Sequence, residues 1–221
     1  MIAAPILALV MQFLSAKDVP LAVVVRVKGH AQAGPAKALR PLKSGDVVSK
    51  DWQIKTESDG QVLLRLLSDR ALADIRPSSL VELGARQGKE TATIQDITLH
   101  GGQIRFQVPG GNSGERANSV TTVATTKAGK YDMSTGVDGN TRVDVISGTV
   151  QVCNQFTGES VSVAPGQSQI SGYDGFGELV KSTTADNVAS SSTDTTSLAV
   201  PFTDPVTGNT SILTVSVKRA R

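Results

Sequence analysis

Apolar residues occupy every second position in a series of short runs within Ala22–Ile170, and this two-residue period is typical of half-buried β-strands. The clearest runs are Arg142–Ile146 and Thr149–Cys153, which meet at a Ser-Gly turn, and Ser160–Ala164, which stops at a Pro-Gly pair. Glycine and proline at the ends of such runs mark tight turns. The chain shows no convincing helical period of 3.6 residues. The pattern therefore predicts an all-β body made of many short strands.

Alternation also predicts which side chains face the core, because successive residues of a strand point to opposite faces of a sheet. The expected buried sets are Val23, Val25 and Val27; Val62, Leu64 and Leu66; Ile104, Phe106 and Val108; Val143 and Val145; Val150 and Val152; and Val161 and Val163. The polar residues between them are expected to stay exposed, namely Arg26, Lys28, Arg105, Gln107, Arg142 and Asp144. The close spacing favours antiparallel strands in a sandwich, a roll or a short solenoid-like stack, and the pattern does not separate these three.

Composition divides the rest of the chain. Two polar segments that contain glycine, Gly84–Thr91 and Pro109–Asn118, are expected to be loops within a β domain over residues 22–170. Residues 171–197 are rich in Gly, Ser and Thr, and bury too little apolar surface to offset the entropy of ordering them. They are expected to form a linker to a C-terminal hairpin and basic tail over residues 198–221.

The hairpin is a candidate interaction element. Leu198–Phe202 and Ile212–Val217 alternate again around a turn, and a lone two-stranded hairpin is marginally stable in water. Pro201 confines the first strand to an edge, so the second is the better candidate for pairing with another chain or with an open edge of the body. The candidate partner-binding residues are Ile212, Leu213, Val215 and Val217. The alternative is a frayed terminus with no role.

At the other end, the apolar run Ile2–Leu14 is followed by Ser15-Ala16 and then by charged residues. A membrane span needs about 20 apolar residues, so this run has the length of a signal-peptide core instead. Residues 1–16 are therefore expected to be a signal-peptide-like segment of an exported protein. Because no basic residue precedes the run, a buried first strand or helix, or a signal with a misassigned start, remains open.

Charge and aromatic content argue against several partners. The 22 basic and 20 acidic residues are mixed along the chain, with a net charge of +2, and form no basic stripe for a phosphate backbone. Aromatic residues make up only 4%, which disfavours single-stranded nucleic acid or sugar as a ligand, since both normally stack on exposed rings. The single cysteine, Cys153, excludes an intramolecular disulfide and is expected to play a small apolar role.

The residues capable of chemistry are few. His30 and His100 each lie beside glycine and are expected to be solvated loop residues, with no second ligand at metal-binding spacing. Asp74 could pair with Asp69 or Glu82 as an acid–base couple, but Trp52 is the only tryptophan available to line a sugar cleft.

Asp138-Gly-Asn140 is expected to be a tight hairpin turn rather than a calcium loop. The sequence thus predicts no enzyme activity, no cofactor and no metal.

Segments spread along the body resemble, in the same order, the motifs of the FecR-type domain, the periplasmic module named for the ferric-citrate regulator. They match patterns such as "I-x-T", "P-x-S-x-L-x-L", "L-x-x-G-x-I-x-F" and "V-x-L-x-x-G-Q", and are Val23–Gly29, Leu42–Asp46, Ile54–Leu66, Pro77–Leu83, Leu99–Phe106, Thr141–Cys153 and Glu159–Gln167. Departures occur at Ser68–Arg70 and at Ala128–Met133, the second in an expected interior strand.

The resemblance implies a periplasmic or extracellular domain that works by protein contact. In the signalling proteins of this family the domain relays a receptor signal toward a sigma factor, but no cytoplasmic segment for that step is recognised here. The expected function is an adaptor or scaffold of the cell envelope or cell surface, with a protein partner or other copies of itself. The alternatives are a structural subunit of a surface assembly joined through its C-terminal strands, and a sensor of envelope glycan or peptidoglycan.

Overall fold

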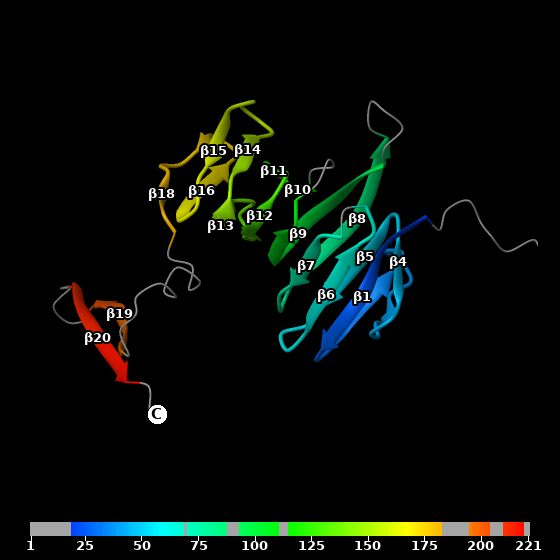
Figure 1. Ribbon diagram of the computed structural model, residues 1–221, viewed down its shortest axis with the longest axis horizontal. Helices are drawn as coiled ribbons and strands as arrows, with labels where there is room; N and C mark the ends of the chain where they lie inside the picture. Colours follow the sequence, from blue (N-terminus) through cyan, green and yellow to red (C-terminus); the bar gives the residue numbers. More distant parts are fainter. Residues whose placement is uncertain are drawn as a thin grey trace, which may run out of the picture. The chain divides into compact units, whose positions relative to one another are not determined.

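The computed structural model describes residues 19–68, 70–87, 93–110 and 115–182; for residues 86–87, 93–95, 195–203 and 210–218 it describes the backbone alone. Every element within these residues is a β-strand, which confirms the all-β prediction (Figure 1). The chain divides into two compact units, Met1–Ser182 and Thr183–Arg221, and each is described by itself. The expected signal-peptide-like segment lies outside the described residues.

The strands of the body pair into two layers. The first layer runs in the order β4 (Val47–Ser49), β1 (Pro20–Lys28), β6 (Gln61–Leu66), β7 (Leu72–Ile75), β9 (Thr93–Val108), β12 (Gly129–Thr135), β13 (Thr141–Gly148) and β16 (Gln167–Gly172), with β17 (Gly175–Phe176) and β18 (Val180–Lys181) both on β16. The second layer runs in the order β3 (Arg40–Pro41), β2 (Ala31–Gly34), β5 (Trp52–Thr56), β8 (Leu80–Gln87), β9, β10 (Glu115–Asn118), β11 (Thr122–Thr126), β14 (Val150–Asn154) and β15 (Ser160–Val163).

β9 belongs to both layers and makes them one hydrogen-bonded sheet. Its first part pairs with β8 and β10 in the second layer, and its last part pairs with β7 and β12 in the first. In Figure 1 it runs between the N-terminal strands, in blue to cyan, and the C-terminal strands, in green to yellow. The pairing of β9 with β10 is parallel, whereas the other pairings are antiparallel, so the sheet is mixed.

β9 changes layers at a bend between Gly101 and Gly102. Gly101 still pairs with Leu80 of β8, whereas Gly102 already pairs with Thr135 of β12. The pairing with β8 skips His100, which forms a β-bulge, and bulges bend a strand and increase its twist. Gly102 has a φ of 92°, a conformation that glycine adopts without the clash of a Cβ. These two local features let a single strand serve both layers.

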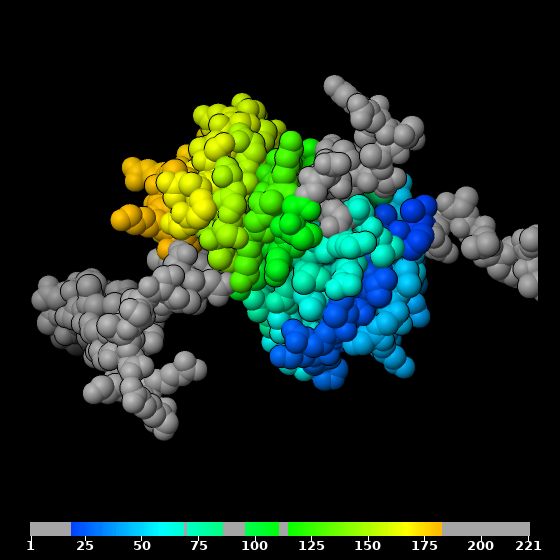
Figure 2. Space-filling view, in the orientation of Figure 1, coloured from blue at the N-terminus to red at the C-terminus, as the bar shows by residue number. Residues whose placement is uncertain are grey.

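Buried residues of the two layers form a single hydrophobic core. The prediction of buried faces is confirmed for the sets on β6, β9, β13 and β14, which are Val62, Leu64, Leu66, Ile104, Phe106, Val108, Val143, Val145, Val150 and Val152. The departure from the FecR-like pattern at β12 fills the core as well, because Tyr131 is buried and stacks on Phe106 with ring centroids 5.0 Å apart. Figure 2 shows the N-terminal and C-terminal halves of the body in direct contact.

The predicted buried face of β1 is wrong. Val25 is 45% exposed, while Val24 is buried, and Val23 and Val27 are half-buried. The pairing with β6 shifts between Val24 and Arg26, so Val25 is the extra residue of a β-bulge. A bulge moves the following residues to the other face, and simple alternation cannot anticipate it.

Strands also extend into segments that composition assigned to loops and linker. β8 continues to Gln87, where it pairs with the start of β9, and β10 occupies Glu115–Asn118. Beyond Ile170 the body continues through β17 and β18 as far as Ser182, whose N–H donates to the carbonyl oxygen of Gly166 (2.8 Å). These short polar strands are held by non-local pairing, which leaves no apolar alternation in the sequence.

The second unit is a two-stranded antiparallel sheet of β19 (Thr195–Thr203) and β20 (Thr210–Lys218). Its register pairs Leu198 with Val215 and Val200 with Leu213. The predicted C-terminal hairpin is therefore present, and each strand is longer than the apolar run that revealed it.

The bend of β9 generates a stability prediction with an adjacent control. A Cβ added at Gly102 would lie 2.3 Å from the hydroxyl of Ser79 and 2.7 Å from the carbonyl oxygen of Ser78, whereas one at Gly101 meets nothing within 4 Å. We expect Gly102→Ala to reduce the free energy of unfolding by at least about 2 kcal/mol, from backbone strain and overlap together. Gly101→Ala should change it by less than about 0.5 kcal/mol. Urea denaturation of both variants measures this, and equal effects would contradict the account of the bend.

Candidate functional site

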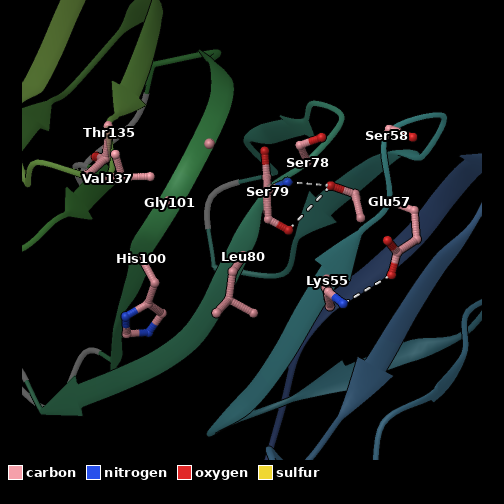
Figure 3. A pocket seen from close by; sticks show the side chains of 13 residues that line it. Lys55, Glu57, Ser58, Ser78, Ser79, Leu80, His100, Gly101, Thr135 and Val137 are labelled. Atoms are coloured by element: carbon pink, nitrogen blue, oxygen red, sulfur yellow. Dashed lines mark hydrogen bonds and ion pairs between the residues drawn. The ribbon is translucent and has the colours of Figure 1, made fainter.

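A groove with a volume of about 540 Å³ lies where the bend of β9 meets three turns of the body. Figure 3 shows its lining, which comes from the end of β5, the β7–β8 turn, the bend itself and the β12–β13 turn. The labelled residues around it are Lys55, Glu57, Ser58, Ser78, Ser79, Leu80, His100, Gly101, Thr135 and Val137.

Two hydroxyl groups beneath the groove hold the bend in place. The N–H of Ser79 donates to Thr56 Oγ1 (2.9 Å), and the N–H of Gln103 donates to Ser79 Oγ (2.9 Å). Thr56 Oγ1 in turn donates to the carbonyl oxygen of Arg76 (2.7 Å). Thr56 and Ser79 are both 2% exposed. Their hydroxyls therefore satisfy buried backbone groups and are structural.

The groups that the groove presents to solvent suit contact rather than catalysis. Lys55 Nζ pairs with Glu57 (3.1 Å), and both side chains are half exposed. His100 Nε2 lies 3.2 Å from Glu82 Oε2, so its described partner is a carboxylate and not a serine hydroxyl. His100 lies within β9 and not in a loop as expected, although its side chain is exposed.

His30 and Cys153 lie in the kinds of environment that the sequence predicted, an exposed turn and a partly buried strand position. His30 is exposed beside the β1–β2 turn, and its Nδ1 lies 2.8 Å from Asp59 Oδ2. The hydrogen bond from His30 lowers the pKa of the Asp59 carboxyl. Cys153 is partly buried on β14, with its Sγ 3.6 Å from the carbonyl oxygen of Asn154.

The carboxylates considered as an acid–base couple have other partners. Asp74 accepts from Gln61 Nε2 (2.7 Å) and lies 3.6 Å from Arg76, whereas Glu82 accepts from Gln53 Nε2 (3.2 Å). Asp74 is on β7 in the first layer and Glu82 on β8 in the second. Asp69 lies outside the described residues.

Asp138-Gly-Asn140 forms the predicted hairpin turn between β12 and β13. The N–H of Gly136 donates to the carbonyl oxygen of Asn140 (3.0 Å), and Gly139 has a φ of 78°. In the part of the chain that the structure describes, no group of three His, Cys, Asp or Glu residues is placed to hold a metal ion. Within the same residues, no helix has the length and hydropathy needed to cross a membrane.

The outer face of the first layer carries buried ion pairs, and here the prediction that Asp144 is exposed is wrong. Asp144 is 8% exposed and accepts hydrogen bonds from Arg142 Nε (2.9 Å), Ser168 and Ser182 Oγ (2.9 Å). It stands directly across from Asp132, which pairs with Arg105 (2.5 Å). Each carboxylate is thus neutralised by its own arginine, and Asp144 also anchors the last residue of the body.

A second group of buried polar residues had no signal in the sequence. They join the turns at one end of the C-terminal half, lie fully or almost fully buried, and are Ser119, Thr121, Thr122, Thr135, Thr141, Asn154 and Ser171. Thr121 Oγ1 lies within hydrogen-bonding distance of the carbonyl oxygens of Gly139 (3.0 Å) and Ser171 (3.1 Å). Asn154 Nδ2 donates to the carbonyl oxygen of Gly172 (2.7 Å). Serine and threonine are usual in exposed turns, so their burial could not be foreseen.

The predicted partner-binding residues are all on β20, and the backbone register separates them. Leu213, Val215 and Val217 occupy alternate positions, paired with Val200, Leu198 and Thr196, and therefore belong to one face of the two-stranded sheet. Ile212, paired with Pro201, belongs to the other face.

Comparisons with known proteins give no family assignment. No family model matches the chain, and no curated protein matches it. Two crystal structures of a proposed anti-sigma factor from Parabacteroides distasonis, at 1.65 Å and 2.50 Å resolution, align with it at 15% and 16% sequence identity, each with a TM-score of 0.47. Each alignment covers 59% of this chain and 58% of that chain. The FecR-type resemblance thus stays an expectation from the motifs.

The environment of Asp144 predicts how stability depends on pH. Burial alone would raise the pKa of its carboxyl, but the hydrogen bonds from Arg142, Ser168 and Ser182 outweigh burial and lower that pKa below 3.8. A carboxyl whose pKa is lowered by folding stabilises the fold above its unfolded pKa, and this contribution is lost as the pH falls through the folded pKa. We expect Asp144→Asn to lower the melting temperature by several degrees at pH 7, because Arg142 loses its partner.

The difference between Asp144→Asn and the unmodified protein should shrink as the pH falls from the ordinary carboxyl pKa of 3.8 through the lower pKa of the folded state, where Asp144 itself becomes protonated. Thermal melts between pH 2 and pH 7 measure this. Glu178→Gln removes an exposed carboxyl from the same C-terminal part of the body and serves as the control. A constant difference across the range, or the same behaviour in the control, would show that Asp144 makes no linked contribution.

Proposed function

We propose that this chain is a non-enzymatic, exported adaptor that works by protein–protein contact in the cell envelope or at the cell surface. Its body provides a β-platform, and its C-terminal hairpin attaches it to a partner. The observation that carries the proposal is the register of β19 and β20. That register gathers Leu198, Val200 and Phe202 with Leu213, Val215 and Val217 on one face of the two-stranded sheet.

Such a sheet gains little stability alone, because an isolated hairpin is marginal in water and an apolar face favours burial. β20 pairs with β19 along one edge, and among the described strands none pairs with its other edge. An added strand of a partner can form backbone hydrogen bonds there while the apolar face is covered. The hairpin therefore offers both affinity and a defined geometry.

A second candidate function uses the same element. If the partner is another copy of the chain, the protein is a structural subunit of a surface assembly joined through its C-terminal strands. The open edge of β20 supports this candidate, because a strand edge that pairs with a different surface of the next copy makes a head-to-tail contact, which extends into a filament unless its rotation closes a ring. Light scattering separates the two, since an adaptor gives a defined species and an assembly gives large polydisperse ones.

The test exploits adjacent positions on opposite faces of the hairpin. In the full chain, expressed in its source cells and crosslinked in situ, Val215→Asp should reduce recovery of the partner at least tenfold, because a charge on the covered face costs several kcal/mol. Ser216→Asp, on the other face, should reduce it less than twofold. The melting temperature of the body should be unchanged in both variants.

Equal recovery with Val215→Asp and Ser216→Asp would refute the hairpin as the attachment element. The same cells test export, because the chain should be recovered from the envelope or the medium without its first sixteen or so residues. Recovery from the cytosol alone with Met1 or Ile2 retained would contradict export.

A further inference from the structure

Each layer of the body ends in strands with a neighbour on one side only, and β15 is the longest of these among the described strands of the body (Figure 1). The others have features that hinder pairing with a second chain. β3 contains Arg40 and Pro41, β18 contains Lys181, β4 is bulged against β1, and β17 has only two residues. Charges, proline, bulges and short length are the usual protection of an edge strand. β15, Ser160–Val163, has no charge and no proline.

One hydrogen bond shows which backbone groups of β15 point outward. The N–H of Asn154 donates to the carbonyl oxygen of Glu159 (2.9 Å), in the same register as the pairing of β14 with β15. In an antiparallel pair, residues bonded to the neighbour alternate with residues that are not. Ser160 and Ser162 therefore direct their N–H and carbonyl groups away from β14. Within the described residues, no strand pairs with this side of β15.

The open part of this edge is closed off at both ends. At one end the N–H of Gly158 donates to the carbonyl oxygen of Asn154 (3.0 Å) inside the β14–β15 turn. At the other end the N–H of Ala164 donates to Gln167 Oε1 (3.0 Å). Only the backbone between these ends is available to a partner, and Val161 is its midpoint. A long extended peptide would gain no further backbone hydrogen bonds here.

A second copy of β15 fits this short edge in one antiparallel register. A two-fold axis beside Val161 places Ser160 opposite Ser162 of the second copy, so that every outward N–H donates to a carbonyl oxygen across the axis. The two Val161 side chains, each half-buried against the core of its own body, then cover one another. A shift of two residues in either direction leaves one of the serines without a backbone partner.

A negative charge lies at the start of the open edge. Glu159 precedes β15 and has the same parity as Val161, so its side chain is on the face directed toward the first layer. A Cβ added at Gly175 of β17, in the first layer, would indeed lie 2.9 Å from Glu159 Oε2. The Glu159 side chain is exposed, and among the described residues it has no cationic partner.

A positive charge lies at the other end of the edge. Lys181 of β18 pairs with Gln167 of β16, and paired residues of neighbouring strands point to the same face. Because the Gln167 side chain reaches Ala164, at the far end of β15, Lys181 also lies on the face turned toward β15. Lys181 is exposed and has no acidic partner within the described residues. The two-fold axis reverses the strand, so Glu159 of one copy comes to the Lys181 end of the other.

We propose that the body forms a two-fold symmetric dimer through β15, with backbone hydrogen bonds between Ser160 and Ser162 and an ion pair between Glu159 and Lys181 on each side of the axis. The contact uses the body alone. It goes beyond the proposed function, because a dimeric adaptor carries two hairpins and binds a partner with two sites more tightly than a single hairpin does.

Sedimentation equilibrium of the full chain with Val215→Asp tests the dimer, because this background removes association through the apolar face of the hairpin. Glu159→Lys and Lys181→Glu should each raise the dimer dissociation constant at least about tenfold, since like charges then meet on both sides of the axis. The two changes together exchange the charges and should restore the constant to within about threefold. Lys37→Glu makes the same charge change in the exposed β2–β3 turn and should have no effect.

Disulfide crosslinking tests the register. In a Cys153→Ser background, Val161→Cys should give a dimer on mild oxidation, because facing residues of a non-bonded pair have Cα atoms about 4.5 Å apart. Ser160→Cys and Ser162→Cys should give at least about fivefold less, because each then lies about 8 Å from its own equivalent, too far for a disulfide. Thermal melts confirm that each variant is folded.

A monomer at all concentrations up to about 1 mM, or a charge exchange that fails to restore the dimer, would overturn the proposal. Equal crosslinking at Ser160, Val161 and Ser162 would overturn the register and the ion pairs with it. The outcome is independent of the proposed attachment, because Val215→Asp should abolish recovery of a partner and leave the dimer intact, whereas Glu159→Lys should do the reverse.

Discussion

The bend of β9 is the constraint on which the body depends. Gly102 turns the strand from one layer into the other, and Ser79 fills the space against it so closely that no side chain fits there. The Ser79 hydroxyl accepts the N–H of Gln103, so the first residue after the bend is bound as it enters the first layer. Because β9 pairs with strands from both halves, it links the two hydrogen-bonded networks and the single core between them.

This bend also gives a physical reason for three separate sequence motifs. The threonine of the I-x-T pattern is Thr56, the serine of P-x-S is Ser79, and the glycine of the L-x-x-G pattern is Gly102. In the fold, Thr56 binds Ser79, and Ser79 binds the residue that follows Gly102. Residues that are 23 and 24 positions apart along the chain thus form one hydrogen-bonded chain. The groove above this chain is a consequence of the bend, and its exposed charged or ionisable side chains include Lys55, Glu57 and His100.

The sequence predicted those parts of the fold that depend on alternation alone. The buried faces of β6, β9, β13 and β14 follow a strict two-residue period. The two apolar runs of the hairpin have the same period in the sequence. The errors arose where non-local structure overrides that period. A bulge reversed the face at Val25, and Arg142 with two serines buried Asp144 on the outer face of a layer. The parallel strand Glu115–Asn118 is polar, and only its pairing with β9 defines it.

The same contrast between local alternation and non-local structure applies to the candidate sites. The hairpin was visible in the sequence because its apolar positions alternate within two short runs, but only the register showed that Ile212 lies on the opposite face from Leu213, Val215 and Val217. The contact between Phe156 and Tyr173 was invisible, because the two residues meet through turns of different strand pairs.

Because β9 pairs with strands of both layers, the body should behave as one cooperative unit. Native-state hydrogen exchange tests it: amides of Leu64 in β6 and Val143 in β13 should open with the same free energy and the same urea dependence. Opening of one half at a clearly lower free energy, with the other half still protected, would contradict it.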